Sequence, residues 1–327
     1  MGEQKQTAAR ARTAAQRIRR FVLETPLAYS PAFSEALGAS VYFKLENRQY
    51  TGSFKLRGAM NRLMTLTDEQ RSKGCVAASS GNHGAAVACA MQTLGANGII
   101  FVPEQTSKVK VDAIRSHGAE VVFFGADGLD TEQHARAYAE REGMVYLSPY
   151  NDPEVIAGQG SCGVEIVEQL GDVETIFIAV GGGGLIGGVG SVLKEHNPAI
   201  RVIACQPSAS AVMARSIEAG EIIEMASEPT LSDGTAGGIE ADAITFPLSQ
   251  RVVDEFVLVD EAQIATAMQQ FMDSEEDIIE GAAGVAIAGL IELAESVRGQ
   301  KVVVLVCGGN IGQEKLDQVR ATARQEA

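Results

Sequence analysis

The stretch Thr175-Ile176-Phe177-Ile178-Ala179-Val180-Gly181-Gly182-Gly183-Gly184-Leu185 combines three signals of a parallel α/β fold. Its first six residues form a short apolar run rich in β-branched side chains, which predicts a strand buried on both faces. Four glycines follow, and a helical pattern begins at Leu185. A buried strand that leads through a glycine loop into a helix is typical of the β-α-β units that make parallel sheets.

Strand and helix patterns of this kind alternate over most of the chain. A first series predicts strands at 76–78, 98–103, 120–125 and 144–147, and helices at 85–94, 108–116 and 131–142. A second series predicts strands at 175–180, 201–205, 255–259 and 301–306. Together they predict an α/β fold with two open, twisted, mainly parallel sheets that are flanked by helices and separated by a cleft.

The charge balance excludes one broad class of function. The 327 residues include 27 basic and 42 acidic side chains, which gives a net charge of −15, and there is no basic run. A phosphate backbone would be repelled, so nucleic-acid binding is not expected. The long uncharged run at 176–193 contains seven glycines. It is predicted as strand, loop and helix, so no membrane association is expected.

The cysteines and the N-terminus indicate a compartment. Five cysteines at irregular spacing predict neither a disulfide framework nor a zinc site. The N-terminal residues are charged and rich in glutamine, and they lack the apolar segment of a secretory signal. A reducing cytoplasm is therefore the expected location.

The glycine loop is suited to a phosphate group. Successive glycines let the backbone wrap around an anion, and the N-terminus of the following helix adds a favourable dipole. The spacing Gly182-x-Gly184-x-x-Gly187 also fits a dinucleotide-binding turn. Such a turn requires an acidic residue at the end of the next strand, where this sequence has Gln206. The dinucleotide alternative is therefore disfavoured.

The stretch Gly52-Ser53-Phe54-Lys55-Leu56-Arg57-Gly58-Ala59 places a lysine at the start of an amphipathic helical pattern. An amine attacks an aldehyde only when it is neutral, and burial or a neighbouring cation lowers its pKa. In the sequence Arg57 is such a cation, and Phe54 could form a wall for a flat aromatic cofactor. Alone, the motif also fits a surface lysine beside a buried phenylalanine. The other motifs favour the functional interpretation.

The turn Ser79-Ser80-Gly81-Asn82-His83-Gly84 follows a predicted strand and precedes a helix of small residues. Backbone N–H groups at such a turn suit an anion, here a substrate carboxylate. Asn82 offers an amide to a ring hydroxyl, and the Ser80 hydroxyl could carry a proton. A plain helix cap is the alternative interpretation, and for Ser79 it is the better one.

The last predicted strand ends in Val306-Cys307-Gly308-Gly309-Asn310, at the edge where open α/β sheets bind ligands. Cys307 could face a ring nitrogen as a weak hydrogen-bonding partner, but taken alone it is more simply a small buried residue. Glu280 precedes a helix of small residues, either as a cap near the cofactor or in a tight helix contact. The histidine spacing predicts no metal site.

In combination these motifs resemble those of the fold-type II pyridoxal-phosphate enzymes, and within them the threonine/serine dehydratase and serine racemase branch. The motifs Thr51–Lys55, Ser80–His83, Gly181–Leu185 and Cys307–Asn310 occur in the order of that family, and the resemblance extends from Thr25 to Asn310. It implies a tryptophan-synthase-β-like fold. The large cofactor-binding domain would comprise 1–74 and 148–327, and a small mobile domain would comprise 75–147.

The resemblance also implies a role for each motif residue. The cofactor, pyridoxal 5′-phosphate, would be bound covalently by Lys55 and contacted at its ring by Phe54, Asn82 and Cys307. Its phosphate would be held by Gly181, Gly182, Gly183, Gly184 and Leu185. The substrate would bind to Ser79, Ser80, Gly81, Asn82 and His83. Lys55 would act as base at the substrate α-carbon, and Ser80 would serve the opposite face.

Two departures from the family pattern bear on the reaction. Cys307 stands where a serine usually faces the ring nitrogen, which favours β-elimination over reactions that need a long-lived carbanion. Gln206 and Val212 stand where metal-activated members have acids, so the usual divalent-cation site is expected to be absent.

The implied activity is the dehydration and deamination of a β-hydroxy amino acid, such as L-threonine or L-serine, to a 2-oxo acid and ammonia. A homodimer or homotetramer is expected. Three alternatives stay open: a serine racemase, a dehydratase for 3-hydroxyaspartate or a hydroxyectoine-derived amino acid, and a non-catalytic metabolite-binding relative. The intact Lys55 and glycine loop argue against the last.

Overall fold

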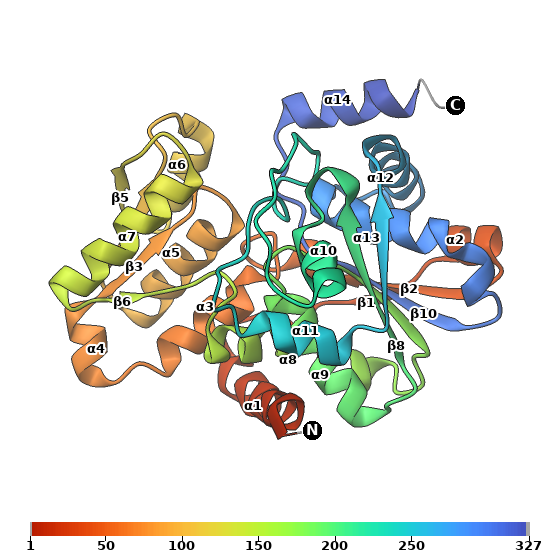
Figure 1. Cartoon of the computed structure of the whole chain (residues 1–327), viewed down its shortest axis with the longest axis horizontal. Coiled ribbons are helices and arrows are strands. Elements are labelled where there is room, and N and C mark those ends of the chain that lie inside the picture. The colour runs from red at the N-terminus through yellow and green to blue at the C-terminus, as the bar shows by residue number, and fades with distance from the viewer. Residues whose placement is uncertain (1, 325–327) are drawn as a thin grey trace.

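The computed structural model describes residues 2–324, which form two separate sheets. The larger sheet has six strands in the order β1-β2-β10-β7-β8-β9, and the smaller has four in the order β5-β4-β3-β6. Among the described strands, the β1–β2 pair is antiparallel and the remaining pairs are parallel. Figure 1 shows the smaller sheet and its helices toward one end of the long axis. The expected fold class is confirmed.

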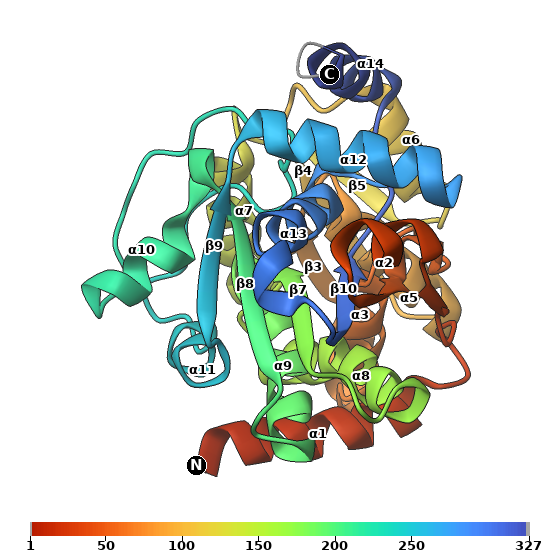
Figure 2. The same ribbon diagram turned by 90° about the vertical axis from the view of Figure 1, so that its right-hand side faces the viewer.

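The larger sheet is enclosed by helices on both faces. Its strands are β1 (Leu27–Tyr29), β2 (Ser40–Leu45), β7 (Thr175–Ala179), β8 (Arg201–Pro207), β9 (Glu255–Val259) and β10 (Lys301–Val306). Helices α12 (Glu261–Glu275) and α13 (Gly281–Glu292) lie on one face, with α14 (Gln313–Ala323) against α12. Helices α8 (Pro153–Gln169) and α9 (Gly184–His196) lie on the other, backed by α1 (Gly2–Ile18), as Figure 2 shows. This enclosure explains why central strand β7 is buried throughout.

The smaller sheet is built from a continuous part of the chain. Its strands are β3 (Cys75–Ala78), β4 (Gly98–Val102), β5 (Glu120–Phe123) and β6 (Val145–Tyr146). Helices α5 (Asn82–Leu94) and α6 (Lys108–Arg115) share one hydrophobic cluster with it, and α7 (Gly128–Glu142) packs against the opposite face. All of its pairs are parallel, so their carboxyl ends meet at one edge.

Five further helices complete the fold. They are α2 (Pro31–Leu37), α3 (Lys55–Met64), α4 (Asp68–Lys73), α10 (Val212–Ala219) and α11 (Thr245–Val252). Helix α3 packs against both α8 of the larger unit and α5 of the smaller one. It therefore lies where the two units meet, and its first residue is Lys55. No helix within residues 2–324 is long and apolar enough to cross a membrane.

Candidate active site

The segment that precedes α3 is joined to the loop that follows β10. Two main-chain hydrogen bonds connect them, from Phe54 N to Cys307 O at 3.1 Å and from Gly309 N to Gly52 O at 2.9 Å, and together they form an antiparallel bridge between Ser53 and Gly308. Gly52 has a φ of 70°, and a Cβ there would lie 2.5 Å from the Asn310 Oδ1 atom. The glycine thus permits the close approach that brings the lysine and cysteine motifs together.

Lys55 is partly buried at the start of α3. Its Nζ atom donates a 3.0 Å hydrogen bond to the Pro149 carbonyl and lies 5.1 Å from the centre of the Phe54 ring. Burial lowers the pKa of the amine to about 8, although Cys307 and Glu280 oppose the shift. An amine with this pKa is neutral in a large fraction of molecules near pH 8, so it is suited to nucleophilic and base chemistry.

Arg57 does not lower the pKa of Lys55, so the expectation that it is the responsible cation is wrong. Its buried guanidinium lies 2.7 and 2.8 Å from the two carboxylate oxygens of Glu46, and 2.6 and 2.8 Å from those of Glu165. Lys44 completes the group with a 2.6 Å bond to Glu165. We call Lys44, Glu46, Arg57 and Glu165 the buried ion quartet. Its two positive and two negative charges offset one another.

The serine and asparagine turn lies at the N-terminus of α5, which begins at Asn82. The Ser79 hydroxyl accepts a 3.2 Å bond from Gly81 N, the local turn contact predicted for that residue, and Ser80 is partly exposed beside it. Buried His83 bonds through Nε2 to the Leu147 carbonyl at 2.8 Å. Burial and the charge of Lys55 lower the pKa of His83 to about 3. This ring is therefore neutral and is not an acid catalyst at neutral pH.

The glycine loop is packed so closely that side chains are excluded from it. A Cβ at Gly182 would lie 2.5 Å from the Tyr150 ring, and one at Gly184 would lie 3.0 Å from Tyr150 Cβ. Gly183 has a φ of 83°, a conformation that favours glycine. Tyr150 directly follows Pro149, which accepts the bond from Lys55. The segment 149–150 therefore connects the lysine with the loop, which ends at the start of α9 and buried Leu185.

Three residues near these motifs were missed or left undecided from the sequence, and Asn310 within the last motif was given no role of its own. Tyr150 and Thr235 pack against the glycine loop, and a Cβ at Gly181 would lie 3.0 Å from Thr235 Cα. Glu280 and Asn310 both bond to the Asn82 amide. Tyr150 lies just beyond the end of β6, at the carboxyl edge of the smaller sheet, and that position is the signal that could have found it.

These residues fit the cofactor implied by the resemblance. The loop Gly181–Gly184 at the start of α9 can hold a phosphate, and Lys55 can react with an aldehyde. Within residues 2–324, the buried hydroxyls of Thr51 and Ser53 next to the lysine motif have no hydrogen-bond partner. Such groups are costly to bury unless something satisfies them, and a polar ligand would do so.

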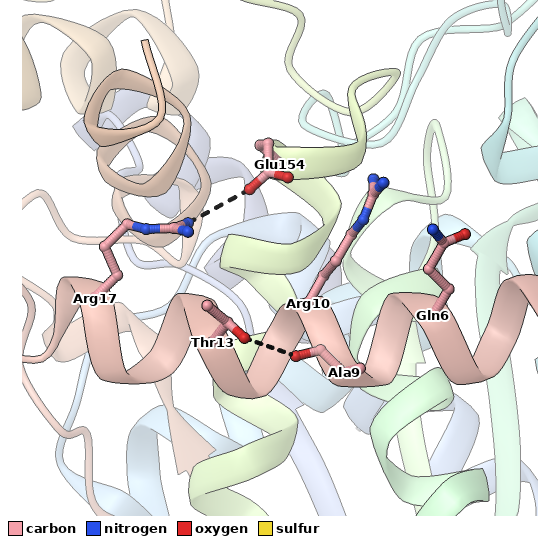
Figure 3. Close-up of a pocket in the computed structure, with 6 residues that line it drawn as sticks. All are labelled: Gln6, Ala9, Arg10, Thr13, Arg17 and Glu154. Carbon is pink, nitrogen blue, oxygen red and sulfur yellow. Dashed lines mark hydrogen bonds and ion pairs between the residues drawn. The ribbon is translucent and has the colours of Figure 1, made fainter. Parts of the chain in front are cut away.

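A separate surface hollow of about 280 Å³ lies along α1. Its lining residues, drawn in Figure 3, are Gln6, Ala9, Arg10, Thr13, Arg17 and Glu154. The Arg17 guanidinium is already bonded to Asn61 at 2.6 Å and lies 3.4 Å from Glu154. None of the four motifs contributes a residue to this hollow, so the candidate active site lies elsewhere.

Comparison with known proteins identifies the family. Residues 18–308 match the family model described as "Pyridoxal-phosphate dependent enzyme". The chain belongs to this family. It is 40% identical over 302 residues to the L-threonine ammonia-lyase of Thermotoga maritima, covering 92% of this chain and 75% of that one. It is 39% identical to the catabolic L-threonine dehydratase of Escherichia coli, covering 94% and 93%.

Solved structures agree in fold. The processed form of threonine deaminase isoform 2 from Solanum lycopersicum superposes with a TM-score of 0.92 at 34% identity, covering 97% of this chain and 93% of that one. Maize serine racemase superposes with a TM-score of 0.90 at 32% identity, covering 97% and 98%. The expected family and its pyridoxal-phosphate cofactor are confirmed, and the two similar structures carry different activities.

Gln206, which stands where metal-activated members of the family have an acid, makes hydrogen bonds within the chain. The Gln206 side chain donates from Nε2 to the Val180 carbonyl at 3.0 Å and accepts from Ala214 N at 2.8 Å. In the part of the chain that the structure describes, no cluster of three or more His, Cys, Asp or Glu side chains is arranged to hold a metal ion. Metal-independent activity stays a prediction.

Proposed function

We propose that this chain is an ammonia-lyase that dehydrates and deaminates a β-hydroxy amino acid, with L-threonine or L-serine as substrate, to a 2-oxo acid and ammonia. The observation that carries the proposal is the environment of Lys55. Its amine has a pKa lowered to about 8 and lies beside Phe54, at the junction of the lysine and cysteine loops. The relatives at 39–40% identity named as threonine ammonia-lyase or dehydratase support the substrate class.

The bound cofactor supplies an electron-withdrawing ring that stabilises negative charge at the substrate α-carbon. Phe54, Asn82 and Cys307 are the proposed ring contacts, and Gly181–Gly184 with Leu185 are the proposed phosphate contacts. The N-terminus of α9 favours the phosphate charge, since its first N–H groups have no partner within the helix. Cys307 is 3% exposed, and burial raises the pKa of its thiol well above the ordinary value. It is therefore a neutral contact, not an anion.

Lys55 performs the proton transfer in this proposal. In its neutral form the amine takes the α-proton of the substrate, and the β-hydroxyl takes up a proton and leaves as water. The enamine that is released then adds water and loses ammonia to give the 2-oxo acid. The first turn of α5, with Ser79, Ser80, Gly81, Asn82 and His83, binds the substrate carboxylate through its N–H groups and side chains. His83 stays neutral and fixes the start of α5 to the segment after β6 through its bond to Leu147.

Serine racemisation is the second candidate, supported by the similar maize serine racemase structure. Racemisation requires a proton carrier on the face opposite Lys55, and the Ser80 hydroxyl is the proposed carrier. Elimination from an L-substrate requires only Lys55. The named relatives at higher sequence identity favour elimination as the main activity.

The setting of the enzyme is also proposed. The unit formed by 75–147 is proposed to move as a small domain against 1–74 and 148–327, because its strands form a sheet of their own. A cytoplasmic homodimer or homotetramer is the proposed form.

A substrate panel tests the function. The purified, cofactor-loaded protein is incubated with L-threonine, L-serine, D-serine and the threo and erythro diastereomers of 3-hydroxyaspartate, and 2-oxo acid, ammonia and amino-acid chirality are measured. Equal amounts of 2-oxo acid and ammonia from L-threonine or L-serine are expected. D-serine formation without 2-oxo acid would identify a racemase, and turnover of 3-hydroxyaspartate alone would reassign the substrate. Cofactor absorbance that responds to none of these amino acids would exclude the proposed activity.

A further inference from the structure

The amide of Asn82 is held from the opposite side of the interface between the two units. Asn82 is the first residue of α5 in the smaller unit, whereas Glu280 precedes α13 and Asn310 follows β10 in the larger one. Asn82 Nδ2 lies 2.9 Å from both carboxylate oxygens of Glu280. Its Oδ1 atom accepts a 2.7 Å bond from Asn310 Nδ2, which also donates to the Thr51 carbonyl at 2.8 Å.

These contacts permit one orientation of the amide. A rotated Asn82 amide would place its oxygen against the ionised Glu280 carboxylate and its NH₂ group against the Asn310 NH₂ group. Both new pairs would lack a donor or an acceptor. One Nδ2 hydrogen shared between the two Glu280 oxygens satisfies the carboxylate, and the second hydrogen remains available for another acceptor.

Glu280 is itself firmly placed. It is 7% exposed, its N–H donates to the Gly308 carbonyl at 3.1 Å, and a Cβ at Gly308 would lie 2.5 Å from its Oε1 atom. A glycine at 308 therefore makes room for the carboxylate beside Cys307. Burying a carboxylate is costly, and among residues 2–324 Glu280 has neither a cation in hydrogen-bonding contact nor a side-chain cap bond to α13 that would offset the cost.

We propose that Glu280 is a positioning residue that orients the Asn82 amide as a donor toward the cofactor ring and holds the start of α5 against the larger unit. This inference rests on the proposed function for the identity of the site. It goes beyond that function because it assigns a role to a carboxylate outside the four motifs and makes closure of the two units depend on its charge.

The charge of Glu280 depends on pH near neutrality. The groups that face it are Lys55 from α3, Cys307 from the end of β10, Asp233 from the loop before α11, and the Asn310 backbone N–H. Burial raises the pKa of Glu280 to about 7, and Asp233, which is paired with Lys315 at 2.9 Å, adds to the rise. Above this pKa both oxygens accept from Asn82, whereas the protonated form keeps one acceptor fewer. The contact should therefore strengthen as the pH rises through about 7.

A pair of charge-exchange variants tests the contact in the cofactor-free full chain. Asn82→Asp places two carboxylates face to face, and Asn82→Asp combined with Glu280→Gln restores one acid and one amide. We expect the single change to speed backbone hydrogen exchange in residues 82–86 by about tenfold, and the double change to reverse most of that increase. Glu275→Gln is the matched control, because Glu275 accepts a hydrogen bond from Ser30 Oγ, which belongs to none of the motifs. Additive effects of the two changes would overturn the proposal.

The cofactor provides a second measurement on the holoenzyme. In the native chain the dissociation constant of pyridoxal phosphate, followed by fluorescence, should fall as pH rises from 6 to 8. Glu280→Gln should weaken binding several-fold at pH 8 and reduce the pH dependence to the part that the Lys55 amine contributes. Asp233→Asn should move the midpoint of the Glu280-dependent part to lower pH. An unchanged pH profile in Glu280→Gln would refute the orienting role. Neither measurement uses a substrate, so a failed substrate panel would leave these outcomes intact, and the reverse also holds.

Discussion

Lys55 and Arg57 are two residues apart on the first turn of α3, yet their side chains lie in opposite electrostatic environments. On one side of the helix, which we call its back, Arg57 belongs to the buried ion quartet, in which the guanidinium contacts both carboxylates within 2.6–2.8 Å. On the other side, which we call its front, Lys55 has a carbonyl and an aromatic ring as neighbours. Among residues 2–324, the Arg57 guanidinium contacts two carboxylates, whereas the Lys55 amine contacts none.

The pKa shifts follow this difference. Burial alone would raise the pKa of Glu46, but Arg57 and Lys44 reverse the effect and lower it. In front, burial lowers the pKa of Lys55 to about 8 and raises that of Glu280 to about 7. A balanced group of buried charges keeps its ionised states and stabilises the fold. An unbalanced one brings its pKa values toward neutrality, where proton transfer is efficient.

The largest expected effect comes from removing the amine in front of α3. Lys55→Ala should abolish turnover and the visible absorbance of the lysine-bound cofactor at roughly 410–430 nm, since the substitution removes the nucleophilic amine. The absorbance spectrum and a borohydride-reduction assay measure this. A borohydride-reducible adduct that persists in Lys55→Ala would assign the covalent anchor to another residue.

Although Lys55→Ala should abolish activity, we expect it to stabilise the fold. The pKa of Lys55 is lowered in the folded state, so the unfolded chain binds more protons between about pH 8 and 10.5, and the folded state is disfavoured below that window. Lys55→Ala should therefore raise the melting temperature of the cofactor-free protein at pH 7, and the gain should shrink as the pH rises through this window. A Lys55→Ala protein that melts at a lower temperature than the native protein at pH 7 would contradict a lowered pKa of Lys55 in the folded state.

The second largest effect is expected behind the helix. Arg57→Leu leaves the buried Glu46 and the partly buried Glu165 without their shared partner, and breaking a buried ion pair typically costs about 3–5 kcal/mol of the free energy of unfolding. Urea unfolding of the cofactor-free protein measures it. Arg57→Lys keeps one charge but cannot contact both carboxylates, so its free energy of unfolding should lie between those of the native protein and Arg57→Leu. An Arg57→Leu protein of native stability and lowered cofactor affinity would show that the quartet serves the site and not the fold.

The sequence predicted the front of α3 better than the back. The motifs carry their chemistry in short segments, so Lys55, Asn82, Gly181–Gly184 and Cys307 could be identified locally. The quartet could not, because Glu165 reaches Arg57 across 108 residues of chain. For the same reason β2 was not predicted, because Lys44 interrupts its apolar run. The fully buried Lys44 amine is satisfied by partners distant in sequence, which are Glu165, Gln169 and the Thr25 carbonyl.

The same distinction explains why Glu280 stayed undecided. In the sequence it fits a helix cap, and the structure places it before α13 without a side-chain cap bond. Its contact with Asn82 spans 198 residues and exists only after the two units have met. Tyr150 was missed because the tight packing of its ring on Gly182 depends on tertiary structure in the same way.

An intermediate effect is expected at Ser80, on the front. Ser80→Ala should leave most L-threonine or L-serine dehydration intact, because elimination uses the Lys55 face, and should remove D-serine formation and activity on D-substrates. Parallel assays of 2-oxo acid and amino-acid chirality measure the ratio. Equal loss of both activities would make Ser80 a contact of the substrate carboxylate and not a proton carrier.

The smallest effect is expected where a buried polar group is satisfied by the backbone alone. Gln206 is 1% exposed, and its amide joins Val180, directly before the glycine loop, to Ala214 of α10. Because both amide atoms have neutral partners, this position resembles the back of α3 in being satisfied, and no cation is needed to hold the loop. Exhaustive chelation should therefore leave the activity unchanged.

Gln206→Ala, in contrast, should cost about 1–3 kcal/mol of stability by leaving the Val180 carbonyl and Ala214 N–H unpaired. A several-fold loss of activity on chelation that magnesium or calcium restores would mean that residues other than Gln206 bind a cation, and that this cation helps to hold the glycine loop.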